Sequence, residues 1–211
     1  MKEQFTVCIG RQYGSGGREV GELVAKKLGV TCYDKLLIQK AAKDSGMDEQ
    51  YLAGHEERLT DLLLPISGNC FADTADMSGI FYSAGDNAYH AEKKAILAIA
   101  EGESSVMIGR CASSILAGRP GTLSVFLYGS EQDCIARIAQ RNRLSERAAR
   151  ERMERINRMR RRYFNFYSMT EWGRPESYDL MLSTSGLGLE GCADAICDVL
   201  KRKLELEADH E

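Results

Sequence analysis

A glycine-rich segment between an apolar strand and an amphipathic helix constrains the fold of this chain more than any other feature. Residues 5–9 are apolar and β-prone, residues 10–17 form the glycine-rich segment, and apolar residues from Val20 to Leu28 follow helical spacing. Glycines let successive N–H groups converge on an anion, and the N-terminus of the following helix adds its positive end. The segment therefore predicts a phosphate-binding loop, with a plain tight turn as the alternative.

The letters of this loop differ from the P-loop motif G-x-x-x-x-G-K-[ST], although its place in the chain is the expected one. When Gly16 is aligned with the second motif glycine, Arg11 falls at the first glycine. Gly17 then replaces the lysine that bridges the phosphates, and Arg18 replaces the hydroxyl residue that binds Mg²⁺. A dinucleotide-binding fingerprint also fits poorly, because Glu19 occupies its third glycine position.

The rest of the chain alternates strand-like and helix-like segments. Further strands are expected at 30–33, 105–108, 123–128 and 178–182, and helices at 18–28, 35–43, 47–64, 88–101, 112–117, 130–142, 146–163 and 189–206. Ser130 and Ser145 are predicted to cap two of these helices. A stretch rich in Gly, Ser and Asp at 65–87 is predicted to be a long loop, and 183–188 a turn. This alternation predicts one α/β domain over residues 1–211, with a five-stranded parallel sheet covered on both faces.

The arginines are concentrated in one segment of an otherwise acidic chain. Eleven arginines, no lysine and three acidic residues lie between Arg137 and Arg162, a net charge of +8. Because the whole chain carries −3, the remainder carries −11. Part of the segment is explained as a solvated helix by three i,i+4 pairs: Glu146–Arg150, Glu151–Arg155 and Glu154–Arg158. Among the arginines near its end, Arg158 and Arg162 share a helix face and are predicted to face phosphate, with Arg161 in reserve.

Composition limits the other functional classes. Arginines beside the aromatic residues at 163–167 suggest nucleic-acid binding, but the acidic remainder argues against a general polyanion-binding protein. No apolar run reaches the roughly 18 residues of a membrane span, and no signal peptide is visible. The seven cysteines lack paired spacing and the three histidines are scattered, which indicates a reduced, cytoplasmic protein without a recognisable metal site. The oligomeric state stays open, a homodimer included.

Five short motifs together resemble the cytidylate-kinase-like family of bacteria. They are the segments 11–19 (RQYGSGGRE), 33–35 (YDK), 108–112 (IGRCA), 172–173 (WG) and 178–180 (YDL). This family is similar to true cytidylate kinases, which are P-loop nucleoside monophosphate kinases. The resemblance implies a three-layer P-loop kinase fold with a five-stranded parallel sheet. It also implies a small helical monophosphate-binding lobe at about 34–90, and an arginine-rich helical lid at about 143–172 that closes over ATP.

The resemblance also assigns site residues. The residues that match the ATP-binding phosphate loop are Arg11, Tyr13, Gly14, Ser15, Gly16, Gly17 and Arg18. Ser183 and Ser185 fall in the segment near the adenine, and Asp34 and Arg110 match the monophosphate site. Cys111 stands where cytidylate kinases have the aspartate of a Gly-Arg-Asp motif. Arg18, Arg158 and Arg162 are the residues predicted to be catalytic, and the metal ligands are unknown.

The sequence thus leaves two main functional hypotheses. The first is ATP- and Mg²⁺-dependent phosphoryl transfer to a nucleoside monophosphate, CMP or dCMP, a reaction that needs positioning and positive charge. The second is a P-loop-derived protein that binds a nucleotide or another anion without chemistry, as the missing lysine and hydroxyl suggest. Asp34 has a second interpretation as the cap of the helix that follows it.

Overall fold

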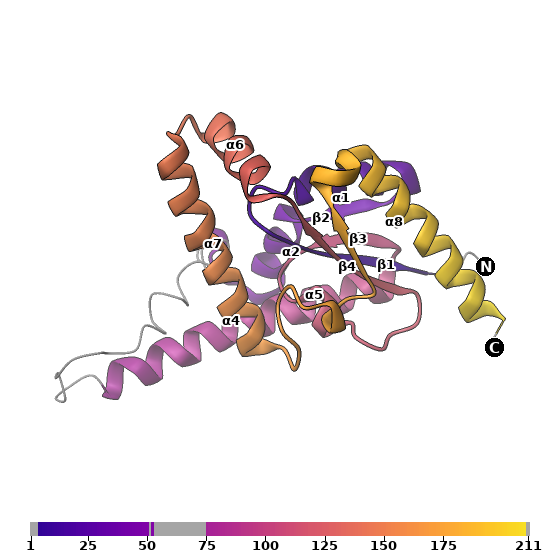
Figure 1. The fold of residues 1–211 in the computed structure, drawn as a ribbon. Helices are drawn as coiled ribbons and strands as arrows, with labels where there is room; N and C mark the ends of the chain where they lie inside the picture. Colours follow the sequence, from indigo (N-terminus) through magenta and orange to yellow (C-terminus); the bar gives the residue numbers. More distant parts are fainter. Residues whose placement is uncertain (1–3, 51, 53–74, 210–211) are drawn as a thin grey trace.

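One five-stranded parallel sheet forms the centre of the molecule (Figure 1). The computed structural model describes residues 4–50, 52 and 75–209. The strands are β1 (Thr6–Arg11), β2 (Thr31–Tyr33), β3 (Ser105–Ile108), β4 (Thr122–Tyr128) and β5 (Leu180–Ser183). They lie in the order β2-β3-β1-β4-β5, and each neighbouring pair is parallel. The predicted five-stranded parallel sheet is therefore confirmed.

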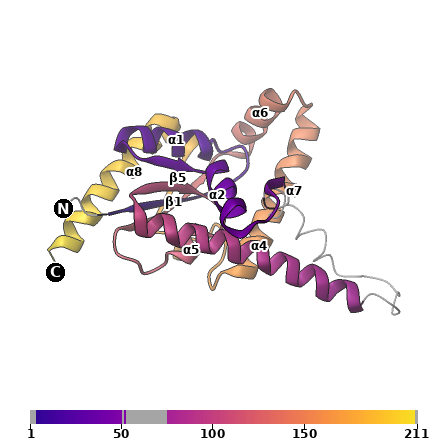
Figure 2. The same cartoon turned by 180° about the vertical axis from the view of Figure 1, so that it is seen from behind.

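Helices cover both faces of this sheet and give the molecule three layers (Figure 1, Figure 2). The layer helices are α1 (Gly17–Leu28), α2 (Lys35–Ser45), α4 (Ala75–Gly102), α5 (Ala112–Ile115) and α8 (Thr184–Ala208). α1 and α8 pack on one face, where Val20, Val24 and Ile196 are fully buried. α2, α4 and α5 pack on the other, against Cys8 and Met107 of the strands. Apolar periodicity in the sequence predicts both packing faces.

Two further helices project from the sheet and are here called the lid helices (Figure 1). They are α6 (Glu131–Asn142) and α7 (Glu146–Tyr167). Ser130 Oγ accepts a hydrogen bond from the N–H of Asp133 at 3.1 Å, and Ser145 Oγ accepts one from Ala148 at 3.3 Å. Both predicted helix caps are confirmed, and each satisfies an N–H that the helix itself leaves free.

The long loop predicted at 65–87 is wrong for residues 75–87, because α4 begins at Ala75. Apolar residues at 77, 80, 81, 84 and 88 keep helical spacing, a signal that the surrounding Gly, Ser and Asp residues obscure. Residues 65–74 lie outside the described residues, as does most of the helix predicted at 47–64. Among the described residues, no helix has the length and apolar character that a bilayer crossing requires.

The turn predicted at 183–188 is wrong in part. α8 begins at Thr184, and Ser183 Oγ caps it by accepting a hydrogen bond from the N–H of Gly186 at 3.4 Å. Gly188 has a φ of 70° and a ψ of 175°, so it kinks the helix instead of separating it from the strand. Short 3₁₀ helix η1 (Pro175–Ser177) precedes β5.

The close packing of α1 on the sheet requires a glycine at position 21, because there is no room for a side chain there. A β-carbon there would lie 2.7 Å from Ile108 Cδ1 and 3.4 Å from Ile9 Cδ1. We expect Gly21→Val to lower the free energy of unfolding by about 1–3 kcal/mol through overpacking, measured by urea denaturation. Gly102→Ala is the control, because the space around Gly102 is open, and it should cost nothing measurable. Equal losses in both variants would contradict close packing at Gly21.

Candidate functional site

The glycine-rich loop joins β1 to α1 at the edge of the sheet where the strands end. Gly14 and Gly16 are left-handed, with φ of 88° and 79°, and α1 begins directly after them. In the part of the chain that the structure describes, the N–H groups of Gly16, Gly17 and Arg18 find no acceptor. Free N–H groups at a helix N-terminus favour an anion. The loop thus has a suitable shape for phosphate, and its binding of ATP stays a prediction.

Arginines of both lid helices reach this loop. Arg137 of α6 donates a hydrogen bond to the Gly14 carbonyl oxygen. Its guanidinium carbon lies 3.6 Å from where a β-carbon at Gly16 would be. Arg160 of α7 donates to the Arg11 carbonyl oxygen at 3.1 Å. Positive charge therefore lies directly beside the free N–H groups of the loop.

Tyr13 strengthens the contact between loop and lid. The guanidinium carbons of Arg141 and Arg160 lie over its ring, 5.3 Å and 5.6 Å from the centroid. Its backbone N–H donates to Asn157 Oδ1 of α7 at 2.7 Å. Burial raises the pKa of Tyr13, but hydrogen bonds and charge from Arg141 and Arg152 outweigh burial and lower it overall. Sequence reasoning gave Asn157 no role, because a polar residue on a polar helix carries no distinctive signal.

The arginines predicted to be catalytic do not make these loop contacts. Arg158 pairs with Glu154 at 3.8 Å, its side chain is 59% exposed, and Arg162 is also exposed. Two residues along a helix rotate a side chain by about 200°, so Arg160 points away from the face that Arg158 and Arg162 share. Arg160, which the sequence did not single out, makes the loop contact. A catalytic role for Arg158 or Arg162 stays a prediction.

Two of the three predicted ion pairs along α7 are replaced by others. Glu154–Arg158 is present, but Arg150 pairs with Glu131 of α6 and Glu151 pairs with Arg147. The neighbouring helix α6 offers Arg150 an acid that sequence spacing alone does not reveal. These exposed pairs contribute little to stability.

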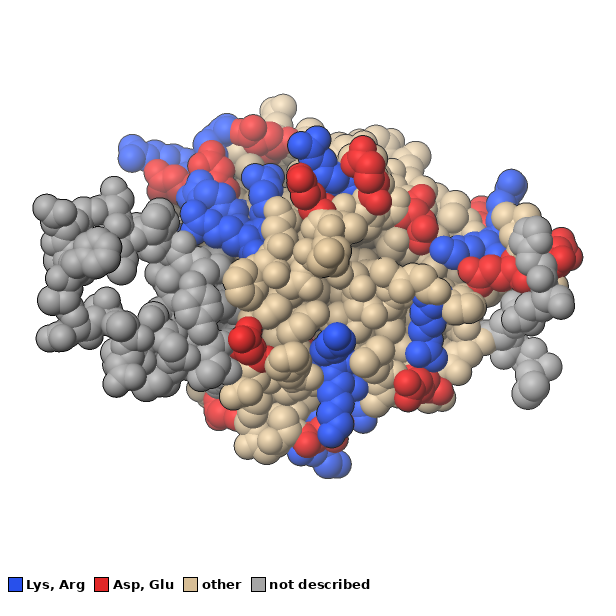
Figure 3. Space-filling view, turned by 90° about the horizontal axis from the view of Figure 1, so that it is seen from below, with Lys and Arg blue, Asp and Glu red and all other residues tan. Residues whose placement is uncertain are grey.

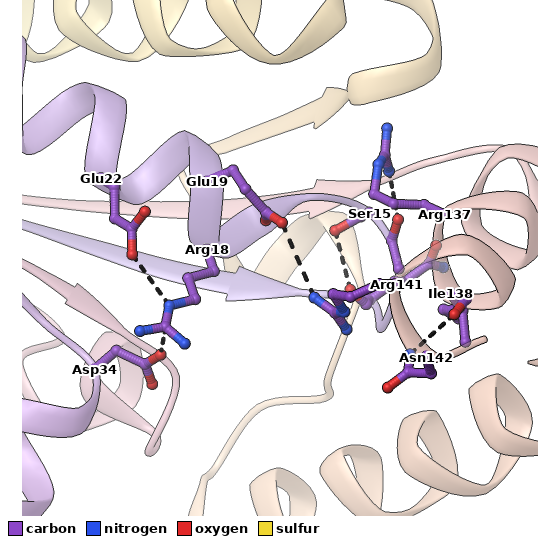
Figure 4. Close-up of polar contacts among 11 residues, drawn as sticks. Ser15, Arg18, Glu19, Glu22, Asp34, Arg137, Ile138, Arg141 and Asn142 are labelled. Carbon is purple, nitrogen blue, oxygen red and sulfur yellow. Dashed lines mark hydrogen bonds and ion pairs between the residues drawn. The ribbon is translucent and has the colours of Figure 1, made fainter.

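Arg18 and Asp34, predicted for opposite sides of the site, contact each other (Figure 4). Arg18 Nε lies 3.1 Å from Glu22 Oε1 and 3.5 Å from Asp34 Oδ2. Asp34 occupies the N-cap position of α2, but its side chain makes no capping hydrogen bond, so its interpretation as a simple cap is wrong. Figure 4 also shows Glu19 directed toward Arg141, which lies 3.9 Å away.

Arg110 lies beside a fully buried carboxylate. Arg110 is 7% exposed, and its Nη1 donates to Glu92 Oε1 at 2.7 Å and to the Leu52 carbonyl oxygen at 3.1 Å. Tyr163 of α7 donates to Glu92 Oε2 at 2.9 Å. Glu92 therefore joins the end of β3, α4 and the lid helix. A buried charge needs such pairing and hydrogen bonds to be tolerated.

The turn that carries Arg110 is strained. Gly109, Arg110 and Cys111 are consecutive left-handed residues, with φ of 76°, 56° and 58°. Left-handed backbone costs non-glycine residues roughly 1 kcal/mol or more, and such strain is typical of functional sites.

Sequence reasoning found Arg110 but missed Glu92. The available signal was an acid within the apolar stripe of α4, four residues after Ala88.

A small cavity of about 20 Å³, enough for roughly one water-sized group, lies at the ends of β1 and β3 beside the C-terminal part of α7. It is here called the strand-end cavity. Its lining includes three arginines and four aromatic residues: Arg11, Arg110, Arg160, Tyr163, Phe164, Trp172 and Tyr178. Tyr163 and Phe164 are buried here, whereas Phe166 is 48% exposed and belongs to the surface. Seen from below, basic side chains gather toward the end that carries α7 (Figure 3).

The segment predicted near the adenine connects to α6. Ser185 Oγ accepts a hydrogen bond from the N–H of Ser130 at 2.8 Å. Hydrogen bonds from Ser185 and Ser130 lower the pKa of Asp133. Leu189, a few residues further on, would meet a β-carbon at Gly16 at 2.6 Å. The structure thus brings Ser185 close to the helix whose Arg137 meets the loop, and adenine binding by Ser183 and Ser185 stays a prediction.

No protein ligand for Mg²⁺ can be assigned. Within residues 4–50, 52 and 75–209, no group of three or more His, Cys, Asp or Glu side chains could hold a metal ion. Ser15 is fully buried and its Oγ donates to the Gln12 carbonyl oxygen at 3.0 Å. The hydroxyl of the loop is therefore turned toward its own backbone.

Comparison with known families agrees with this geometry. Residues 6–186 match the sequence model of the cytidylate kinase-like family. The chain belongs to the cytidylate kinase-like family. The match covers the glycine-rich loop, the Arg110 turn, both lid helices and β5, so the resemblance drawn from five short motifs is confirmed.

Solved structures share the fold of this cytidylate kinase-like chain. An uncharacterized protein from Eubacterium ventriosum has a TM-score of 0.71 at 24% identity, covering 94% of this chain and 99% of that one. A shikimate kinase from Bacteroides thetaiotaomicron has a TM-score of 0.53 at 11% identity, covering 93% and 98%. A shikimate kinase from Acinetobacter baumannii, in complex with shikimate, also has 0.53, at 12% identity, covering 95% of each chain. These likenesses show the P-loop kinase fold.

One curated protein matches a smaller part of the chain. It is a uronate isomerase of Corynebacterium glutamicum, 28% identical over 106 residues. The match covers 49% of this chain and 20% of that protein, so the chain spans only a small part of its relative.

The buried carboxylate yields a stability test. Glu92→Ala leaves Arg110 buried without its acid, so we expect the free energy of unfolding to fall by about 3–5 kcal/mol in urea denaturation. Tyr163→Phe keeps the ring and removes one hydrogen bond, and should cost about 1 kcal/mol. If both variants lost the same small amount, Glu92 would not be the charged centre of this network.

Proposed function

We propose that this protein transfers the terminal phosphoryl group of ATP to a nucleoside monophosphate, with CMP and dCMP as the first candidates. The observation that carries this proposal is the convergence of lid arginines on the free N–H groups of the glycine-rich loop. Membership of the cytidylate kinase-like family supports the reaction class and suggests the acceptor.

Phosphoryl transfer is catalysed mainly by positioning and by positive charge around the phosphates. The motif lysine is missing from the loop, but Arg137 of α6 lies beside Gly16 and Arg160 of α7 is bonded to the loop. The planar guanidinium binds phosphate oxygens two at a time. In this proposal Arg137, Arg141 and Arg160 supply the charge on the donor side. Two of them precede the predicted lid boundary at residue 143.

On the acceptor side, we propose that Arg110 and Asp34 face the monophosphate. Arg110 ends a central strand at the edge where ligands of parallel sheets bind. The proposed substrates are nucleotides of the cytoplasm, so we propose that the protein acts there. Since two solved neighbours are shikimate kinases, shikimate is included below as a non-nucleotide acceptor.

The second candidate is a protein that binds a nucleotide and does no chemistry. Gly17 and Arg18 occupy the lysine and hydroxyl positions of the motif, and Arg18 is already paired with Glu22 and Asp34. A loop that holds phosphate through its backbone alone would suit a sensor.

A turnover assay separates the two candidates. Purified protein is incubated with ATP, Mg²⁺ and, in separate reactions, CMP, dCMP, UMP, AMP, GMP and shikimate, and ADP and phosphorylated acceptor are measured. We expect ADP formation that depends on CMP or dCMP. Absence of turnover with every acceptor, together with a rise in Tm on adding ATP, would reject the kinase and favour the sensor.

Arg137 offers a sharper test of the donor side. We expect Arg137→Gln to lower kcat by about 100-fold or more, because it removes charge beside the transferring phosphates. Arg147→Gln is the matched control, since that side chain is 89% exposed and paired with Glu151. A similar loss of kcat in both variants would show that the effect comes from general lid charge.

A further inference from the structure

Arg11 occupies space that the usual P-loop leaves for another side chain. A β-carbon at Gly17 would lie 2.6 Å from Arg11 Cβ and 2.9 Å from Arg11 Cγ. Any side chain at position 17 would therefore collide with the stem of Arg11. A lysine at position 17 and the arginine at position 11 would therefore compete for the same space. In this chain the cation of the loop lies at the end of the strand.

The Arg11 guanidinium points toward the end of β3. A β-carbon at Gly109, directly after β3, would overlap the Arg11 guanidinium. The glycines of the loop face the other way: Gly14 lies against Cys134 of α6, and Gly16 against Leu189 of α8. These helices follow β4 and β5, which lie on the opposite side of β1 from β3. Arg11 is thus directed away from the cradle of N–H groups.

The Arg11 guanidinium lies beside the strand-end cavity. Arg11 and Arg110 both line the cavity, whereas none of the described loop residues 12–17 does. Within the described residues, the side chain of Arg11 has neither an acidic partner nor a hydrogen-bond acceptor. An unpaired, partly buried cation beside a cavity favours an anionic ligand there.

A second unsatisfied group lines the same cavity. Tyr178 is 8% exposed, and its hydroxyl has no hydrogen-bond partner among the described residues. Burial raises the pKa of this tyrosine, while the nearby Gly173 backbone and the charge of Arg11 oppose the rise. The hydroxyl therefore stays neutral and can donate a hydrogen bond. Buried polar groups are normally hydrogen-bonded, so a ligand atom is a natural partner for it.

We infer that the Arg11 guanidinium and the Tyr178 hydroxyl form an anion subsite at the end of β1, which binds one oxygen of the phosphate group of the acceptor. The word acceptor rests on the proposed function; the subsite itself rests on the cavity and on these two groups. Arg11, which the motif alignment places with ATP, thus serves the opposite side of the reaction. Tyr178 adds a neutral donor to the positive charge.

Ligand binding without turnover tests this inference. Dissociation constants for CMP, inorganic phosphate and ATP are measured separately by calorimetry on the wild type, Arg11→Gln and Tyr178→Phe. Glutamine keeps the stem that packs under Gly17 and removes the charge, and phenylalanine keeps the ring. We expect Arg11→Gln to weaken CMP and phosphate binding about 10- to 100-fold, and Tyr178→Phe about two- to tenfold. ATP binding should change less than twofold.

The outcomes separate this inference from the kinase proposal. If Arg11→Gln weakens ATP binding and spares CMP, Arg11 belongs to the donor side and the inference is overturned. It is also overturned if the wild type binds neither CMP nor phosphate, or if Arg147→Gln weakens CMP equally. If CMP binding depends on Arg11 but no phosphorylated acceptor forms, the subsite stands and the kinase proposal fails.

A swap variant tests the steric exchange independently. Gly17→Lys alone should lower Tm, because the new side chain meets the Arg11 stem. Adding Arg11→Gly in the same chain should recover much of that loss by clearing the space, and CMP binding should weaken as in Arg11→Gln. If the double variant is no more stable than Gly17→Lys, the two positions do not exchange space as inferred.

Discussion

The arrangement of α4, the sheet and α7 depends on how the charge of Glu92 is neutralised. This carboxylate is fully buried, yet it belongs to a helix whose other buried residues are mostly apolar. Arg110 reaches it from the end of β3, so a shift of the Arg110 turn would leave a buried charge without its partner. Tyr163 reaches it from α7 and adds a hydrogen bond. The C-terminal half of the lid helix is therefore fixed to the body.

Most of the fold could be predicted because its signals are local. Apolar spacing and helix caps such as Ser130 and Ser145 depend only on neighbouring residues, and both caps form as expected. The error at 75–87 arose because composition and spacing disagreed, and spacing was the better guide. The start of α8 was missed because Gly186 and Gly188 suggest a turn, whereas only Gly188 departs from helical geometry.

The site was less predictable, because it depends on directions in space. The glycine-rich loop and Arg110 follow from strand ends, and the structure places both at one edge of the sheet. The choice among Arg158, Arg160 and Arg162 depends on the rotation of α7 against the loop, which no local pattern specifies. Glu92 and Asn157 act only through partners more than 15 residues away in sequence. Their roles require the tertiary structure.

The docking of the lid on the loop involves main-chain atoms of the loop. Arg137 contacts the carbonyl of Gly14, Asn157 the N–H of Tyr13, and Arg160 the carbonyl of Arg11. Such contacts are indifferent to which side chains the loop carries, provided that its backbone path is kept. The side chains of the loop can therefore be substituted while its hydrogen bonds to the lid helices are kept. A protein of this design can keep the contacts between loop and lid helices with a loop sequence that differs from the P-loop motif, so a search by residue type alone will overlook it.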